Sequence, residues 1–122
     1  MKPLFVDDSV EVLDLARSYF ATELAIDLIT TRDELEALRL VFSKEVDIVI
    51  ADHELRPGSA MELYSAIREI DPLIPFILVA LYPPTSHIRH FLTETGVPVV
   101  YKNDIGAGFL ESLRRAVMSF FH

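Results

Sequence analysis

The chain has 122 residues, of which 51% are hydrophobic and 25% are charged. This length predicts one domain with a core that needs no cross-links, and the apolar share excludes a disordered protein. The absence of cysteine excludes disulfides, thiolate catalysis and cysteine-based zinc sites. The formal net charge of −8 argues against direct binding to nucleic acid or anionic lipid, because both are negatively charged.

The sequence contains no segment with the pattern of a signal peptide or a membrane span. The first apolar stretch ends at Asp7, too early for a signal-peptide core. The longest apolar run, 73–84, is interrupted by prolines and falls well short of the roughly 20 residues of a spanning helix. We therefore expect a protein that does not enter a membrane and is cytoplasmic by default.

Hydrophobic periodicity predicts strands and helices in alternation from the start of the chain. Residues 4–6 are typical of a strand buried on both faces, and 9–22 carry apolar residues at helical spacing. A second strand is predicted over 25–29. Thr31 and Glu34 have the spacing of a capping box, which predicts a second helix. Its buried stripe is expected to contain Leu35, Leu38 and Phe42.

The middle of the chain continues the pattern. Residues 46–51 are predicted to form a central strand, and 52–58 a loop, because it contains proline and glycine. Ser59 and Glu62 repeat the capping-box spacing, so a third helix begins there and ends before Pro72. Its buried face is expected to contain Leu63, Ala66, Ile67 and Ile70.

Two further strands are predicted over 75–81 and 97–101. Between them Thr85 or Ser86 caps a fourth helix, and Gly96 ends it. A last helix is expected over 105–121. The apolar residues expected to face the core from these two helices are Ile88, Phe91, Leu92, Leu110, Leu113, Val117 and Phe120.

Five strands that alternate with five helices predict an α/β fold. The expected architecture is a doubly wound, five-stranded parallel sheet in the order 2-1-3-4-5, flanked by five helices and flavodoxin-like. Residues 1–122 are expected to form this single domain, with no internal repeat and no linker.

Charged residues follow three of the predicted strands. Asp7 and Asp8 follow the first strand, Asp52 the third and Lys102 the fifth. Binding sites of doubly wound sheets lie at the carboxyl ends of the strands, so these side chains are expected to meet. Clustered carboxylates suit Mg²⁺, and a lysine beside them suits a phosphate oxygen. The placement therefore predicts phosphoryl transfer onto an aspartate.

The chain resembles the receiver domain of two-component response regulators, and the resemblance spans essentially all of it. The matching segments are 5–9, 48–52, 55–58, 75–79 and 98–102.

The resemblance implies roles for individual residues. Asp52 would accept a phosphoryl group from a phosphohistidine of a sensor histidine kinase or phosphotransfer protein. Asp7, Asp8, Asp52 and the backbone carbonyl of Glu54 would hold Mg²⁺, and Lys102 would pair with the phosphate. Such a domain is not an enzyme beyond catalysing its own phosphorylation and dephosphorylation.

The sequence departs from the family pattern at the positions that carry the switch. Ala80 stands where receivers usually have Thr or Ser, and Val99 stands where they usually have an aromatic residue. Asn103 replaces the proline that usually follows the lysine, so a cis peptide bond is not expected there. Ala60 is a lesser departure, from glycine. We therefore expect the phosphoacceptor chemistry to be intact. We do not expect the conformational response to phosphorylation that is usual in receivers.

Other surfaces carry further expectations. Glu54, two residues past the acceptor, and Tyr82 opposite it are expected to tune the lifetime of the aspartyl phosphate. The face formed by 85–95, 97–101 and 105–121 is the expected output surface and a possible homodimer contact. Its expected residues include Arg89, His90, Tyr101 and Arg114. The histidines expected on the surface are His53, His87, His90 and His122. The acidic residues expected on solvated helix faces and ends are Glu34, Glu36, Glu45, Asp71, Glu94 and Glu111.

Alternatives remain open from the sequence alone. Asp52 could cap a turn, and Asp7 and Asp8 could cap the first helix. A degenerate receiver could act as a docking or dimerisation module without phosphorylation. A haloacid-dehalogenase-like phosphatase would use Asp7 as nucleophile, but Ser9 stands where that family places its second aspartate.

Overall fold

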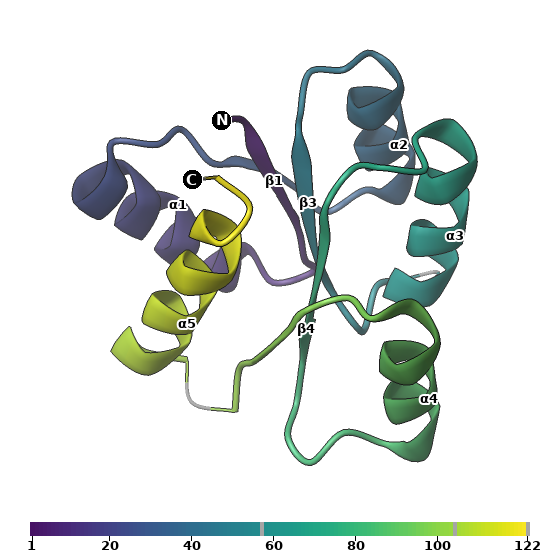
Figure 1. Cartoon of the computed structure of the whole chain (residues 1–122). Helices are drawn as coiled ribbons and strands as arrows, with labels where there is room; N and C mark the ends of the chain where they lie inside the picture. Colours follow the sequence, from purple (N-terminus) through teal and green to yellow (C-terminus); the bar gives the residue numbers. More distant parts are fainter. Residues whose placement is uncertain (57, 104, 122) are drawn as a thin grey trace.

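A computed structural model describes residues 1–56, 58–103 and 105–121, and these form five strands and five helices in strict alternation (Figure 1). The strands are β1 (Pro3–Val6), β2 (Ile29–Thr31), β3 (Ile48–Asp52), β4 (Phe76–Ala80) and β5 (Val99–Tyr101). The helices are α1 (Val10–Leu24), α2 (Glu34–Phe42), α3 (Ala60–Ile70), α4 (Ser86–Thr95) and α5 (Ala107–Met118). All strand pairs are parallel in the order β2-β1-β3-β4-β5, which confirms the predicted fold class.

Helices cover both faces of the sheet. Figure 1 shows α1 and α5 on one side and α2, α3 and α4 on the other. Side chains alternate between the two faces along each strand. Phe5, Ile50 and Val79 pack under α1 and α5, whereas Val49 and Leu78 pack on the opposite face. The position of a residue along its strand therefore decides which of the two cores its side chain joins. The same alternation decides toward which face the last residue of a strand points.

Helix caps explain where several helices begin and end. The Ser59 hydroxyl accepts a hydrogen bond from the Glu62 N–H, and the Thr85 hydroxyl accepts one from the Ile88 N–H. Gly96 ends α4 in the left-handed conformation, with φ of 68°. These three predicted caps are confirmed.

The predicted position of the second strand is wrong by several residues. Ala25 takes the left-handed conformation that ends α1, with φ of 54°, and so it does not begin a strand. The strand is Ile29–Thr31, which pairs with β1 at the edge of the sheet. Thr31 lies in this strand rather than at a helix cap. The cap of α2 is Asp33, whose carboxylate accepts a hydrogen bond from the Leu35 N–H.

The predicted buried stripe of α2 is wrong at two of its three residues, since only Leu38 packs against the core. Leu35 and Phe42 are about three-quarters exposed, at 75% and 74%. Ala37, Leu40 and Val41 face the core instead. This helix is apolar on most sides, so its sequence is compatible with two stripes.

The predicted buried residues of the other helices are confirmed, except at the helix ends. Ile88, Leu110, Leu113 and Val117 are buried, as are Leu63 and Ile67 of α3. Ile70 and Phe120, the last apolar residues of their stripes, are each 38% exposed. Among the described helices, none has both the length and the apolar character needed to cross a bilayer.

Candidate functional site

The alternation of side chains carries three charged residues to one end of the sheet. Asp7 follows Val6 at the end of β1, Asp52 ends β3, and Lys102 follows β5. Counted in steps of two, Asp7 continues the face of Phe5, Asp52 that of Ile50, and Lys102 that of Val100. Parallel strands bring their carboxyl ends to the same edge, so the three side chains converge below α1 and α5.

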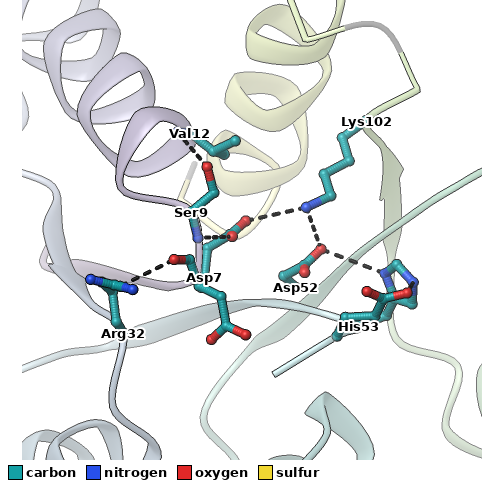
Figure 2. A network of polar contacts seen from close by, with 9 residues as sticks. Asp7, Ser9, Val12, Arg32, Asp52, His53 and Lys102 are labelled. Carbon is teal, nitrogen blue, oxygen red and sulfur yellow. Dashed lines mark hydrogen bonds and ion pairs between the residues drawn. The ribbon is translucent and has the colours of Figure 1, made fainter. Parts of the chain in front are cut away.

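Lys102 contacts both buried aspartates (Figure 2). Its Nζ lies 2.8 Å from Asp52 Oδ1 and 3.5 Å from Asp7 Oδ2. Asp7 is 1% exposed and Asp52 is 3% exposed, so these charges are almost fully removed from water. Burial alone lowers the pKa of Lys102, but the bonds and charges of the two aspartates outweigh it and raise this pKa overall.

Asp7 is fixed in place by the start of α1. Its Oδ1 accepts a hydrogen bond of 2.8 Å from the Ser9 N–H, and the Ser9 hydroxyl accepts one from the Val12 N–H. Burial raises the pKa of Asp7, the Ser9 N–H lowers it, the charge of Asp52 raises it and Lys102 lowers it, and the net direction is upward. The negative charge of Asp7 is therefore incompletely compensated. The Ser9 hydroxyl caps α1, and serine lacks the carboxyl group that a haloacid-dehalogenase-like phosphatase would use there as general acid.

The buried carboxylate of Asp52 has one close partner. Its Oδ1 forms an ion pair with Lys102 Nζ at 2.8 Å. His53 Nδ1, also buried and without a hydrogen-bond partner, lies 3.5 Å from the same oxygen. His53 is thus only partly exposed, and the expectation that it is a surface histidine is wrong. An oxygen of this kind is available to a cation or an electrophile.

The three residues open onto a cleft of about 370 Å³. Its lining consists of Asp7, Asp8, Ser9, Asp52, Glu54, Arg56 and Lys102. Four carboxylates thus face two cations. Asp8 is half-buried, and its backbone oxygen accepts a hydrogen bond of 3.1 Å from Arg32 Nε. The cleft therefore has an excess of negative charge beside the partly buried Lys102.

The donor set of the cleft fits a hard cation held partly by water. Within residues 1–56, 58–103 and 105–121, no three side chains of His, Asp or Glu lie close enough to ligate one ion. Mg²⁺ usually takes one or two carboxylates and keeps several waters, and carbonyl oxygens also serve. Asp7, Asp8, Asp52 and Glu54 line the same cleft and supply oxygen atoms of the kinds that Mg²⁺ binds.

The end of β4 has no polar side chain that reaches this cleft. Ala80 is fully buried on the face opposite to Asp52, and Val99 packs on that same opposite face. Tyr82 is 62% exposed, does not line the cleft, and packs its ring edge-on against Tyr101 at 5.1 Å. The structure thus brings Asp7, Asp8, Asp52, Glu54 and Lys102 together, and leaves Ala80, Val99 and Tyr82 outside.

Two residues at the cleft were not predicted from the sequence to belong to the site. Arg56 lines the cleft, and His53 lies between Asp52 and Glu54, with Nε2 3.4 Å from Glu54 Oε1. Their position in the loop after β3 was the available signal. His122 and Pro57, which belongs to the matching segment 55–58, lie outside the described residues.

Two acidic residues expected on solvated helix faces have environments that the sequence did not predict. One carboxylate oxygen of Glu34 is buried without a hydrogen-bond partner, and burial and the charge of Glu62 raise its pKa. Glu111 bonds Arg114 and also accepts a hydrogen bond from the Tyr19 hydroxyl of α1. These bonds lower the pKa of Glu111 to about 2. Arg114 therefore takes part in the contact between α1 and α5.

Comparison with known proteins identifies relatives by structure rather than by sequence. A scan against family models and a search of curated proteins gave no match. Among solved structures, the receiver domain of the hybrid histidine kinase CckA matches over 100% of both chains, at 18% identity and a TM-score of 0.75. A signal receiver domain of an HD domain-containing protein from Pseudomonas fluorescens matches 97% of this chain and 87% of its own, at 26% identity and a TM-score of 0.76. Chemotaxis protein CheY4 of Vibrio cholerae matches over 97% and 96%, at 18% identity and a TM-score of 0.75.

Each of the three is similar to this chain over nearly its whole length. The chain has the fold of response regulator receiver domains, as its segments 5–9, 48–52 and 98–102 led us to expect.

Proposed function

We propose that the chain is a phosphoacceptor signalling domain of a two-component system, with Asp52 as the residue that receives the phosphoryl group. The observation that supports the proposal is the buried Asp52 carboxylate, which lines the acidic cleft and whose Oδ1 lies 2.8 Å from Lys102 Nζ. A buried carboxylate among further carboxylates is costly in a purely structural role. It is useful in a nucleophile, because a lone pair stays available.

The transfer is a displacement at phosphorus. An oxygen of the Asp52 carboxylate forms a bond to phosphorus while the bond from phosphorus to the donor histidine nitrogen breaks. The electron pair of that broken bond stays on the imidazole, which leaves as a neutral ring because its other nitrogen carries a proton. The attacking group is the Asp52 carboxylate, so the step releases no proton.

Lys102 supplies the positive charge at the acceptor. In the free domain its ammonium pairs with Asp52, and after transfer it is close enough to bind an oxygen of the new phosphate. Asp7 holds the ammonium from the other side at 3.5 Å. The N–H of Ser9 in turn orients Asp7, so the start of α1 positions the acidic side of the cleft.

Asp7, Asp8, Asp52 and the Glu54 carbonyl are the residues that would hold Mg²⁺. When bound, the ion would neutralise charge on the phosphoryl oxygens and on the acidic cleft. The raised pKa of Asp7, caused first by burial and then by the charge of Asp52, supports a cation there. The chain itself contributes the arrangement of these oxygens around Asp52.

The donor would be a phosphohistidine of a sensor histidine kinase or a phosphotransfer protein. The chain would catalyse no more than its own phosphorylation and dephosphorylation. Glu54 lines the cleft and is therefore placed to influence a water that approaches the aspartyl phosphate. The output surface would be the face formed by α4, β5 and α5, and it could also pair two copies of the chain.

Incubation of the intact chain with Mg²⁺ and acetyl phosphate tests the proposal. We expect intact-mass spectrometry to find one added phosphoryl group on the wild type and none on Asp52→Asn. Asp14→Asn, an exposed aspartate on α1, is the matched control and should be modified like the wild type. The absence of an adduct on the wild type, or an undiminished adduct on Asp52→Asn, would rule out the proposed acceptor.

A second candidate function follows from the buried Ala80. Without a hydroxyl at the end of β4, the domain could serve as a docking or dimerisation module that ignores phosphorylation. This candidate predicts that Mg²⁺ with beryllofluoride, an aspartyl-phosphate mimic, binds the cleft without moving the amide resonances of α4 and β5. Large shifts in those elements would exclude it.

A further inference from the structure

The side chain of Asn103 joins two loops at the carboxyl edge of the sheet. Its Oδ1 accepts a hydrogen bond of 2.6 Å from the Tyr82 N–H, and its Nδ2 donates one of 2.6 Å to the Tyr82 carbonyl. Asn103 follows β5, whereas Tyr82 lies between β4 and α4. The amide thus satisfies both backbone polar groups of one residue on a different loop, and we call these two bonds the Asn103 clamp.

One end of the Asn103 clamp leads directly to the acidic cleft. Asn103 is the residue after Lys102, whose Nζ lies 2.8 Å from Asp52. The Lys102 N–H also donates to the Ala80 carbonyl at 3.0 Å, which continues the pairing of β4 with β5. The backbone at 102 and 103 is therefore held between the acceptor on one side and the end of β4 on the other.

The other end of the Asn103 clamp leads to α4. Tyr82 stands three residues before Thr85, whose hydroxyl accepts from the Ile88 N–H and caps the helix. The Tyr82 ring also packs edge-on against Tyr101 of β5, with an interplanar angle of 82°. A displacement of Tyr82 would therefore move the residues before α4 and change the packing on Tyr101 of β5.

We infer that the Asn103 clamp couples the acidic cleft to α4, in place of a hydroxyl at the end of β4. The inference rests on the proposed function, because it takes phosphorylation of Asp52 as the event to be transmitted. Ala80 has no group that can reach a phosphate, so β4 offers no direct link. Lys102 does reach the site, and a shift of its ammonium onto a phosphate oxygen pulls on the residue that carries the clamp.

An asparagine is suited to this role by its chemistry. The amide offers an acceptor and a donor on one rigid plane, and both are used here. A proline at 103 would have neither, and an aspartate would keep the acceptor but place a negative oxygen against the Tyr82 carbonyl. Asn103→Asp therefore breaks one bond of the clamp with almost no change in side-chain shape.

The experiment compares amide resonances of the full chain with and without Mg²⁺ and beryllofluoride. In the wild type we expect shifts at 52 and 102, and also at Tyr82 and in the first turn of α4. In Asn103→Asp and Asn103→Ala, the shifts at Tyr82 and α4 should be largely lost, because both variants lack the hydrogen bond from Nδ2 to the Tyr82 carbonyl. The shifts at 52 and 102 should persist.

Ile105→Ala is the matched control, because Ile105 lies in the same connection and is 47% exposed. It should leave every shift as in the wild type. Asn103→Asp guards against a fold defect in Asn103→Ala, since it preserves the size of the side chain.

Each other outcome overturns a distinct claim. Shifts at Tyr82 and α4 that survive in both variants, or that are missing from the wild type despite shifts at 52 and 102, overturn the role of Asn103 and leave the acceptor intact. An absence of shifts at 52 and 102 overturns the proposed function and the coupling with it.

Discussion

Replacing Lys102 with methionine removes the cation that both buried aspartates contact. At 2.8 Å and an effective dielectric of about 20, the attraction between Nζ and Asp52 Oδ1 is about 6 kcal/mol. Desolvation of both charges offsets much of this gross energy. Removal of one partner of a buried ion pair typically costs about 3–5 kcal/mol, and the open cleft places Lys102→Met at the lower end, about 3 kcal/mol.

A double-mutant cycle separates the pair from its surroundings. Urea unfolding at pH 7 without Mg²⁺ would be measured for the wild type, Lys102→Met, Asp52→Asn and the double variant. We expect Asp52→Asn alone to cost little, because it relieves an excess of carboxylates, and the coupling energy to be about 2 kcal/mol. A coupling energy near zero, or a Lys102→Met variant as stable as the wild type, would refute the interpretation of Lys102 as the compensating charge.

The free energy of unfolding should also depend on pH through Lys102, which provides a second measurement on the same variants. Its pKa is raised in the folded chain above the ordinary value of 10.5. The stability it contributes is therefore fully present below pH 10.5 and is lost as the pH rises through the higher folded value. The wild type should lose stability in that alkaline range, and Lys102→Met should lose less.

Three further predictions concern the core, the α1–α5 contact and the metal. Leu40→Ala should lower the free energy of unfolding by about 2–5 kcal/mol, and Leu35→Ala on the same helix should change it by less than about 0.5 kcal/mol; equal losses in urea titrations would restore the predicted stripe. Glu111 has a pKa of about 2, below its ordinary 4.5, so its contribution is present above pH 4.5 and is lost as the pH falls toward 2. Acid titration of Glu111→Gln, followed by circular dichroism, should therefore show a shallower loss of stability over that window, and a curve that parallels the wild type would contradict this. Mg²⁺ at ten times its dissociation constant should raise the free energy of unfolding by about 1.4 kcal/mol in the wild type and by much less in Asp52→Asn, and an equal gain in both would place the ion elsewhere.

The sequence predicted the fold well where a single pattern, an apolar run or a polar residue at a strand end, is enough to identify the element. The central strands are buried on both faces and form apolar runs in the sequence. Their alternation with helices predicted a parallel sheet, and 2-1-3-4-5 is one of the two common orders of such sheets. Asp7, Asp52 and Lys102 were placed together because parallel strands share an edge. That argument needs only the strand ends, which polar residues mark clearly.

The errors arose where two physical solutions compete. Ala25 begins an apolar run, but the end of α1 requires a left-handed residue there, and the edge strand β2 begins only at Ile29. In α2 two apolar stripes are available, and packing against the sheet buries the one that contains Ala37, Leu40 and Val41. The environment of His53 and the Asn103 clamp depend on side-chain directions across loops, which no local pattern encodes.

The most direct test of the account is chemical mapping of the phosphorylated residue. After treatment of the chain with Mg²⁺ and acetyl phosphate, borohydride reduces an aspartyl phosphate to homoserine, which peptide mass spectrometry locates. We expect homoserine at 52, in an amount that depends on Mg²⁺ and is strongly reduced in Lys102→Met. Homoserine at another aspartate, or at none in a chain that binds Mg²⁺, would contradict the assignment of Asp52 as the acceptor.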